Sequence, residues 1–202
     1  MARVKLTKTE LKAQTDALKR YRRFLPMLQL KKQQLQAEIA RISAAADAVA
    51  DKEAALEKSI SGWLGLIASD PGAVEGLVES FSVETSSANI AGVQIPVFVS
   101  AETSIAKIDK WASPAWTDDV AGAASEMLSL RAQRETLEEQ IRLVGEELSQ
   151  TSQRVNLFEK VKIPECREAI RVIKIALGDE QTAAVTRGKI AKSRTPESED
   201  AA

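Results

Sequence analysis

The residue types that most often carry out covalent chemistry are scarce in this sequence. Its 202 residues include no histidine and one cysteine, Cys166. Without histidine, the chain cannot build a Ser-His-Asp or Cys-His nucleophile system or a histidine-ligated metal site. A lone cysteine excludes an internal disulfide and fits a reducing compartment. We therefore expect Cys166 to be a packed or surface thiol rather than a nucleophile.

The remaining polar residues form no recognisable catalytic motif. No GxxxxGK[ST] phosphate-binding loop occurs, and no GxGxxG follows a predicted strand. The carboxylates lie mainly on predicted helix faces beside Lys and Arg, where ion pairing one turn apart is their usual role. The sequence therefore predicts no catalytic residues, no cofactor and no metal site.

Charge is distributed unevenly although the formal net charge is −1. Residues 1–32 hold ten Lys and Arg against two acidic residues, whereas residues 68–130 hold two Lys against nine acidic residues. A basic segment can bind nucleic acid, but no series of aromatic residues accompanies this one. We favour docking on an acidic protein surface, or simple solvation, over contact with nucleic acid.

Hydrophobic patterning gives no sign of a membrane segment. The longest apolar patch, residues 63–68, is far shorter than the roughly 18 residues that indicate a membrane-spanning helix. The basic N-terminus is not followed by the apolar stretch of a signal peptide. We expect no direct insertion into a membrane.

Two long helices dominate the prediction. Between residues 4 and 67, apolar residues recur every seven positions in two series offset by three and four, as in a coiled coil; Lys32 and Glu53 interrupt one series. The pattern returns over residues 130–158 and resumes in a shifted phase after Pro164. Pro26 is expected to favour a kink.

The expected ends of the second helix come from its capping residues. Ser113 and Pro114 predict its start, and Gly178 predicts its end. Two helices of similar length separated by about 50 residues suggest an antiparallel pair. If residues near 66 and 124 face each other, Pro26 and Pro164 lie at one level and both termini lie together at the same tip.

The middle of the chain predicts a different structure. Residues 68–76 read as a turn leading into a short helix. Residues 81–99 then alternate apolar and polar side chains around the turn sequence SANIAG, which predicts a β-hairpin whose second strand has a free edge at Pro96. Its small apolar face predicts an element that meets a partner rather than forming core.

The fold class is therefore mainly α, an antiparallel two-helix coiled coil with a small head that holds a short helix and the hairpin. The expected divisions are a long N-terminal helix at 1–67, an acidic head at 68–113, a long C-terminal helix at 114–178 and a flexible tail at 179–202.

Three segments resemble one protein family. NIAGVQIPVF at Asn89–Phe98 resembles its hairpin signature, and QRVNLFEKVKIP at Gln153–Pro164 resembles its C-terminal helix motif. The basic segment Leu6–Leu35 is similar to its N-terminal helix. On these residues, the chain resembles the D subunits of the rotary V-type and A-type ATPases in their prokaryotic form. The resemblance covers nearly the whole chain.

The resemblance implies a non-catalytic central rotor protein that couples ATP synthesis or hydrolysis to ion translocation. Its partners would be the catalytic and regulatory A and B subunits, the F subunit of the rotor, and a funnel-shaped protein above the membrane ring. It would lie in the cytoplasm, peripheral to the inner face of the cell membrane.

Three groups of residues are expected to meet those partners or shape the shaft. The residues expected to face the hexamer that the A and B subunits form are Lys12, Lys19, Arg20, Arg22, Arg23, Arg187 and Lys189. On the hairpin they are Asn89, Ile90, Val93, Ile95, Pro96 and Val97. The shaft motif consists of Arg154, Val155, Asn156, Ile163 and Pro164.

Two other functions remain open. The heptad pattern also suits a free-standing coiled-coil adaptor or spacer, and the basic N-terminus suits a helical protein that associates with nucleic acid. A parallel homodimer would favour the spacer. Salt-sensitive binding to DNA or RNA would favour the protein that associates with nucleic acid.

Overall fold

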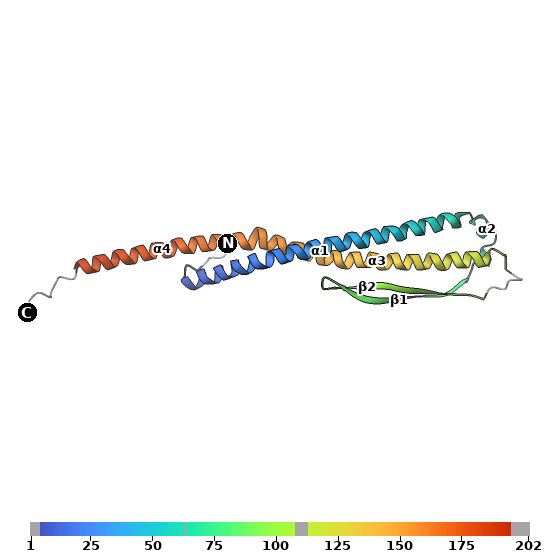
Figure 1. The fold of residues 1–202 in the computed structure, drawn as a ribbon, viewed down its shortest axis with the longest axis horizontal. Coiled ribbons are helices and arrows are strands. Elements are labelled where there is room, and N and C mark those ends of the chain that lie inside the picture. The colour runs from blue at the N-terminus through green and yellow to red at the C-terminus, as the bar shows by residue number, and fades with distance from the viewer. Residues whose placement is uncertain (1–4, 63, 108–112, 195–202) are drawn as a thin grey trace, which may run out of the picture. The chain divides into compact units, whose positions relative to one another are not determined.

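A computed structural model describes residues 5–62, 64–107 and 113–194 of the chain (Figure 1). The chain divides into two compact units, one built from residues 1–30 and 151–202 and the other from residues 31–150. Among the described residues, no helix is both long and apolar enough to cross a membrane.

The helices confirm the predicted fold class. The N-terminal helix α1 spans Lys8–Ser61 and continues through Pro26. The C-terminal helical region consists of α3 at Thr117–Leu157, a π-helical turn η2 at Phe158–Lys162 and α4 at Ile163–Arg194. Between them lie the short helices α2 at Leu64–Ser69 and η1 at Pro71–Ala73, followed by the hairpin.

The unit of residues 31–150 is held by a narrow apolar core. Leu35 and Ile42 of α1 form a buried cluster with Val144 of α3 and Ile95 of the hairpin. Beside this core, Lys31 Nζ lies 2.6 Å from a carboxylate oxygen of Glu147. The helices therefore pair through the predicted heptad positions and run antiparallel (Figure 1).

The hairpin is longer than predicted. Strand β1 spans Val78–Ile90 and pairs antiparallel with β2, which spans Val93–Ile105. Ala91 and Gly92 connect them with φ angles of 51° and 90°. Positive φ at both positions is characteristic of a type I′ turn. The Gly92 N–H donates to Asn89 Oδ1 at 2.9 Å, which fixes the turn.

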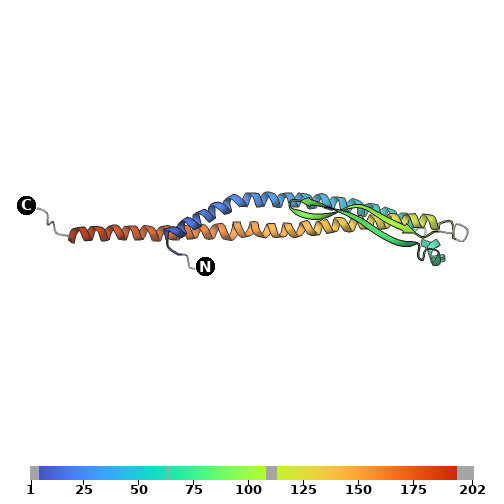
Figure 2. The ribbon, with the colours of Figure 1, turned by 90° about the horizontal axis from the view of Figure 1, so that it is seen from below.

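The turn half of the hairpin is part of the core, so the prediction that the hairpin lies outside the core is wrong there. Ile95 is 3 % exposed in the cluster with Leu35, and Ile90 and Val93 pack against that cluster. Figure 2 shows the hairpin lying along the helices. The small apolar face is buried because the chain folds it onto its own helix pair.

In the unit of residues 1–30 and 151–202, one aromatic contact gives the register of the helices. The rings of Tyr21 on α1 and Phe158 on η2 lie 4.9 Å apart. Because the helices are antiparallel, Pro26 lies on one side of this contact and Pro164 on the other, a stagger of roughly 16 Å. The prediction that the two prolines share a level is wrong.

The stagger has a simple origin in the helix ends. Helix α1 ends at Ser61 and α3 begins at Thr117, whereas the prediction has residues near 66 and 124 facing each other. The expected start at Ser113 is also wrong. The Thr117 N–H donates to Pro114 O at 3.1 Å, so a turn precedes the helix.

The π-helical turn explains the shifted phase after Pro164. Buried residues on the second helix are seven positions apart from Val144 to Thr151 and again from Cys166 to Ile173. From Val155 to Ile163, however, the step is eight. A π turn holds one additional residue, so the buried residues after it still face the same side of the helix as those before it.

Hydrogen bonding at this turn agrees with that account. The Ile163 N–H donates to Phe158 O, five residues earlier. Pro164 has no N–H, and its ring would press on the Lys160 carbonyl in a regular α-helix. The wider turn thus accommodates Pro164 within a continuous helical segment.

The expected helix end at Gly178 is wrong, because α4 continues to Arg194. The Thr182 hydroxyl donates to Gly178 O at 3.0 Å, and the Thr186 hydroxyl donates to Thr182 O at 3.0 Å. Alanines follow within this segment and favour a helix. Residues 195–202 of the expected tail lie outside the described residues.

Candidate functional site

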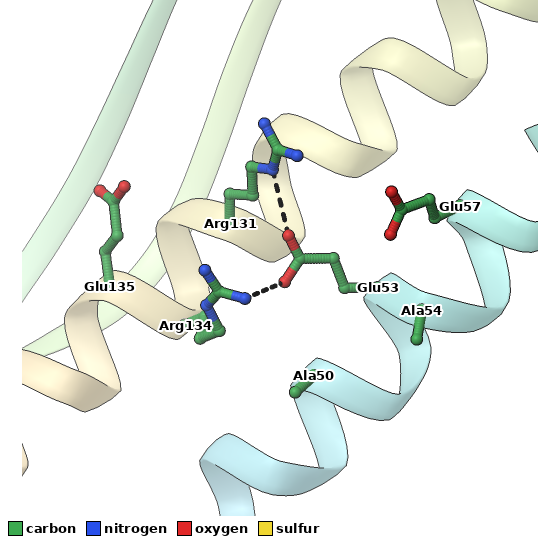
Figure 3. Close-up of a pocket in the computed structure, with 7 residues that line it drawn as sticks. All are labelled: Ala50, Glu53, Ala54, Glu57, Arg131, Arg134 and Glu135. Carbon is green, nitrogen blue, oxygen red and sulfur yellow. Dashed lines mark hydrogen bonds and ion pairs between the residues drawn. The ribbon is translucent and has the colours of Figure 1, made fainter.

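One ion-pair cluster joins the two helices of the unit of residues 31–150. Glu53 is only 7 % exposed on α1. It accepts hydrogen bonds from Arg131 Nε at 3.1 Å and from a terminal nitrogen of Arg134 at 2.7 Å, both on α3. Figure 3 shows the two guanidinium groups on either side of the carboxylate. Each oxygen of Glu53 is therefore held by a different arginine.

This cluster lines a shallow cleft that also includes Ala50, Ala54, Glu57 and Glu135. The alanines leave room for the long arginine side chains between the helices. Glu53 stands at a heptad core position, where the sequence showed only an interrupted apolar series. A charged residue at such a position is itself a signal of a partner across the seam, but it does not identify Arg131 or Arg134.

The cysteine lies in the helix seam. Cys166 is 6 % exposed on α4, and burial raises the pKa of its thiol, with Glu165 adding to that effect. A raised pKa lowers the fraction of reactive thiolate at neutral pH. Among the described residues, no group of three or more His, Cys, Asp or Glu is placed to hold a metal ion.

The expected hexamer-side residues form two separate groups. Lys12, Lys19, Arg20, Arg22 and Arg23 are all exposed on α1. Arg187 and Lys189 are exposed on α4, roughly 45 Å along the helix from the level of Tyr21.

The described ends of α1 and α4 lie at different levels, whereas the prediction had both ends of the chain at one tip. Helix α4 extends past the beginning of α1 (Figure 1). From Gly178 to Ser193 every residue is exposed, including Val185 at 60 % and Ile190 at 47 %. The end of α4 is thus a single helix, which separates its basic residues from those of α1.

The expected hairpin residues differ in exposure. Asn89 is exposed near the end of β1, whereas Ile90, Val93, Pro96 and Val97 are half-buried. Ile95 is buried in the core. On β2, the Pro96 carbonyl accepts a hydrogen bond from Gln140 Nε2 of α3 at 2.6 Å. Gln140 was not singled out from the sequence, because an amide on a helix face does not indicate its acceptor.

The shaft-motif residues alternate between the seam and the surface. Val155 and Ile163 are buried, at 5 % and 7 % exposure. Arg154, Asn156 and Pro164 are exposed. The motif therefore combines two seam contacts, which flank the π-helical turn, with polar side chains that face outward.

Comparison with known proteins agrees with this geometry. The sequence profile of the ATP synthase D subunit matches residues 10–193. The chain is 44 % identical over 193 residues to the V-type ATP synthase D subunit of Borreliella burgdorferi, covering 96 % of this chain and 95 % of that protein.

Two chlamydial proteins of the same name are also similar. Identity is 35 % over 200 residues with that of Chlamydia caviae, covering 96 % of this chain and 94 % of the other. It is 32 % over 197 residues with that of Chlamydia muridarum, covering 96 % of each. The chain belongs to the family of ATP synthase D subunits.

Proposed function

We propose that this protein is the non-catalytic central rotor shaft of a V-type ATP synthase. It would couple ATP synthesis or hydrolysis in a hexamer of A and B subunits to ion translocation across the membrane. The observation that carries the proposal is the family match over residues 10–193, on a chain whose long helices pair antiparallel.

The packing of the helix pair suits the transmission of torque. Apolar side chains interlock along the seam around Leu35, Ile42 and Val144. The Glu53 cluster ties α1 to α3 through two arginines, and Lys31 pairs with Glu147 beside the core. Each contact resists sliding or rotation of one helix against the other, so that a twist applied at one place is passed along the pair.

The exposed basic residues suit a contact that is broken and remade as the shaft turns. The five basic residues of α1 are exposed, and exposed ion pairs contribute roughly 0–1 kcal/mol each. Many weak contacts hold a shaft in a sleeve without locking it at one angle. We place this face, with Arg187 and Lys189 on the single-helix end of α4, against the hexamer.

The remaining partners follow from the same proposal. The F subunit would bind alongside the helix pair, and a funnel-shaped protein would connect the shaft to the membrane ring. The chain would then lie in the cytoplasm, peripheral to the inner face of the cell membrane. A free-standing adaptor or spacer is the alternative, and it predicts that the chain works without ATPase subunits.

Co-expression with the other subunits of the complex from the same genome tests the proposal. We expect the chain to co-purify with the A, B and F subunits. Changing Lys19, Arg20, Arg22 and Arg23 together to Glu should abolish assembly with the hexamer while the circular dichroism spectrum stays helical. Single alanine changes at these positions should leave ATP turnover nearly normal, because no single exposed pair matters much.

The outcome distinguishes the two functions. A chain that never enters the complex, or one that forms only a parallel homodimer, supports the adaptor. Normal assembly by the fourfold charge reversal contradicts docking through the basic face of α1.

A further inference from the structure

We propose that the outer edge of β1 receives an extended, positively charged segment of a neighbouring protein of the complex, which adds to the hairpin as a third strand. The inference rests on the proposed function, since it assumes that the chain is assembled with other subunits. The two edges of the hairpin differ in how well they are protected.

The edge of β2 is closed near the turn. Pro96 has no N–H to donate, and its carbonyl is already bonded to Gln140 of α3. A proline and a covering side chain are two of the devices by which proteins protect a sheet edge. In Figure 1, β2 lies between α3 and β1. A further strand therefore cannot add on that side.

The edge of β1 has no such protection near the turn. Every residue from Glu79 to Asn89 is exposed, and this stretch contains no Pro, Lys or Arg. A bulge lies between Glu84 and Thr85, but pairing is regular from Thr85 to Ile90. An unprotected edge of this kind is a template for another strand.

The pairing shows which backbone groups point outward. Ile90 and Val93 flank the two-residue turn and pair directly, so their N–H and C=O groups face each other. The alternation then makes Ser87 and Pro96 a pair without mutual hydrogen bonds, which agrees with the proline and its bond to Gln140. Thr85, Ser87 and Asn89 consequently direct their N–H and C=O groups away from β2.

Charge identifies the kind of segment that fits. The strands carry Glu79, Glu84 and Glu102 and no basic residue. Glu84 and Glu79 accept hydrogen bonds from Ser100 and Ser104, so their carboxylates lie at the hairpin surface with neutral partners. A second copy of this chain would bring the same acidic residues, whereas a segment with Lys or Arg would find opposite charge.

Hydrogen exchange of single amides tests the added strand. In the free chain, we expect the Ser86 and Ala88 amides to be protected by β2 and the Thr85, Ser87 and Asn89 amides to exchange rapidly. In the purified complex with the other subunits, the latter three should exchange at least about ten-fold more slowly. This alternation distinguishes strand addition from a partner that merely covers one face.

Two variants of Ser87 distinguish the effect of its backbone N–H from the effect of its side chain. Ser87→Pro removes an outward N–H and leaves the pairing with β2 intact, so the Thr85 and Asn89 amides should lose the protection gained in the complex. Ser87→Ala keeps that N–H and should retain the protection. Ser86→Pro, which removes an inward N–H, should disrupt the hairpin even in the free chain.

A carboxylate-to-amine crosslinking reagent tests which protein supplies the added strand. We expect Glu84 to be linked to a Lys of another protein in the complex. Crosslinks only between copies of this chain, with concentration-dependent protection of the free protein, would contradict the proposal in favour of a second copy. Rapid exchange of the Thr85 and Asn89 amides in a fully assembled complex would contradict the added strand but not the proposed function. A chain that fails to assemble would instead contradict the proposed function and remove the partner with it.

Discussion

At the residue scale, the Glu53 cluster shows how a charged side chain can occupy a coiled-coil seam. Its carboxylate is buried, but Arg131 and Arg134 keep 58 % and 39 % of their side chains exposed. The arginine stems cover the seam while their charged ends reach water. The cluster therefore combines a nearly buried anion with cations that remain hydrated.

Replacing Glu53 with Ala should destabilise the protein by about 1–2 kcal/mol. The loss is smaller than for a fully buried ion pair, because the two arginines can be solvated once their partner is gone. Glu57→Ala is the matched control on the same helix, since Glu57 is exposed; it should change the free energy of unfolding by less than about 0.5 kcal/mol. Equal urea midpoints for the two variants would contradict a stabilising role for the cluster.

At the element scale, the π-helical turn keeps the buried residues before and after it on the same side of the helix, facing α1. One additional residue in an α-helix rotates everything beyond it by about 100°. The turn at Phe158–Lys162 absorbs that rotation, so that Cys166 and Ile173 still reach the seam. Pro164 follows at the place where a regular α-helix would be strained.

A matched pair of deletions tests this role. Deleting exposed Val161 together with Pro164→Ala should produce a regular α-helix with seven-residue spacing and change the melting temperature by only a few degrees. Deleting exposed Arg167 with the same Pro164→Ala leaves the additional residue before Ile163 in place, so the buried residues on one side of the deletion should turn out of the seam and the melting temperature should fall much further. Thermal unfolding followed by circular dichroism measures both, and equal losses would contradict the account.

The helices and the hairpin could be predicted from the sequence, and the features that could not be predicted have physical reasons. Heptad spacing identifies helices and seam residues because it records which face is buried. It does not specify stagger, which depends on where α1 ends and α3 begins. The sequence showed the phase shift after Pro164 but not the π turn that produces it. The alternation over residues 81–99 predicted a hairpin, whereas only the fold reveals that Ile95 completes the core.

At the scale of the whole molecule, the antiparallel register is the feature that most affects the proposed shaft. Moving one heptad from the contact of Tyr21 with Phe158 places Leu28 level with Thr151. Leu28 is half-buried and Thr151 is 1 % exposed, as expected of facing seam positions.

Engineered cysteines test this register. With Cys166→Ala, the pair Leu28→Cys and Thr151→Cys should oxidise to a disulfide within one chain, seen as a monomer of altered mobility on a non-reducing gel. The pair Leu28→Cys and Lys162→Cys is the control, because it lies roughly 16 Å out of register and should remain reduced. Disulfide-linked dimers alone would indicate pairing between chains and contradict the fold.

Rotation is the most direct test of the central claim. The complex of this chain with the A, B and F subunits would be fixed to a surface through its A subunits, with a bead attached at Asp70→Cys in a Cys166→Ala background. Asp70 is exposed and lies just before η1. We predict that the bead turns in one direction when ATP is added and stops when ATP is removed. ATP hydrolysis with a stationary bead would contradict the rotor shaft.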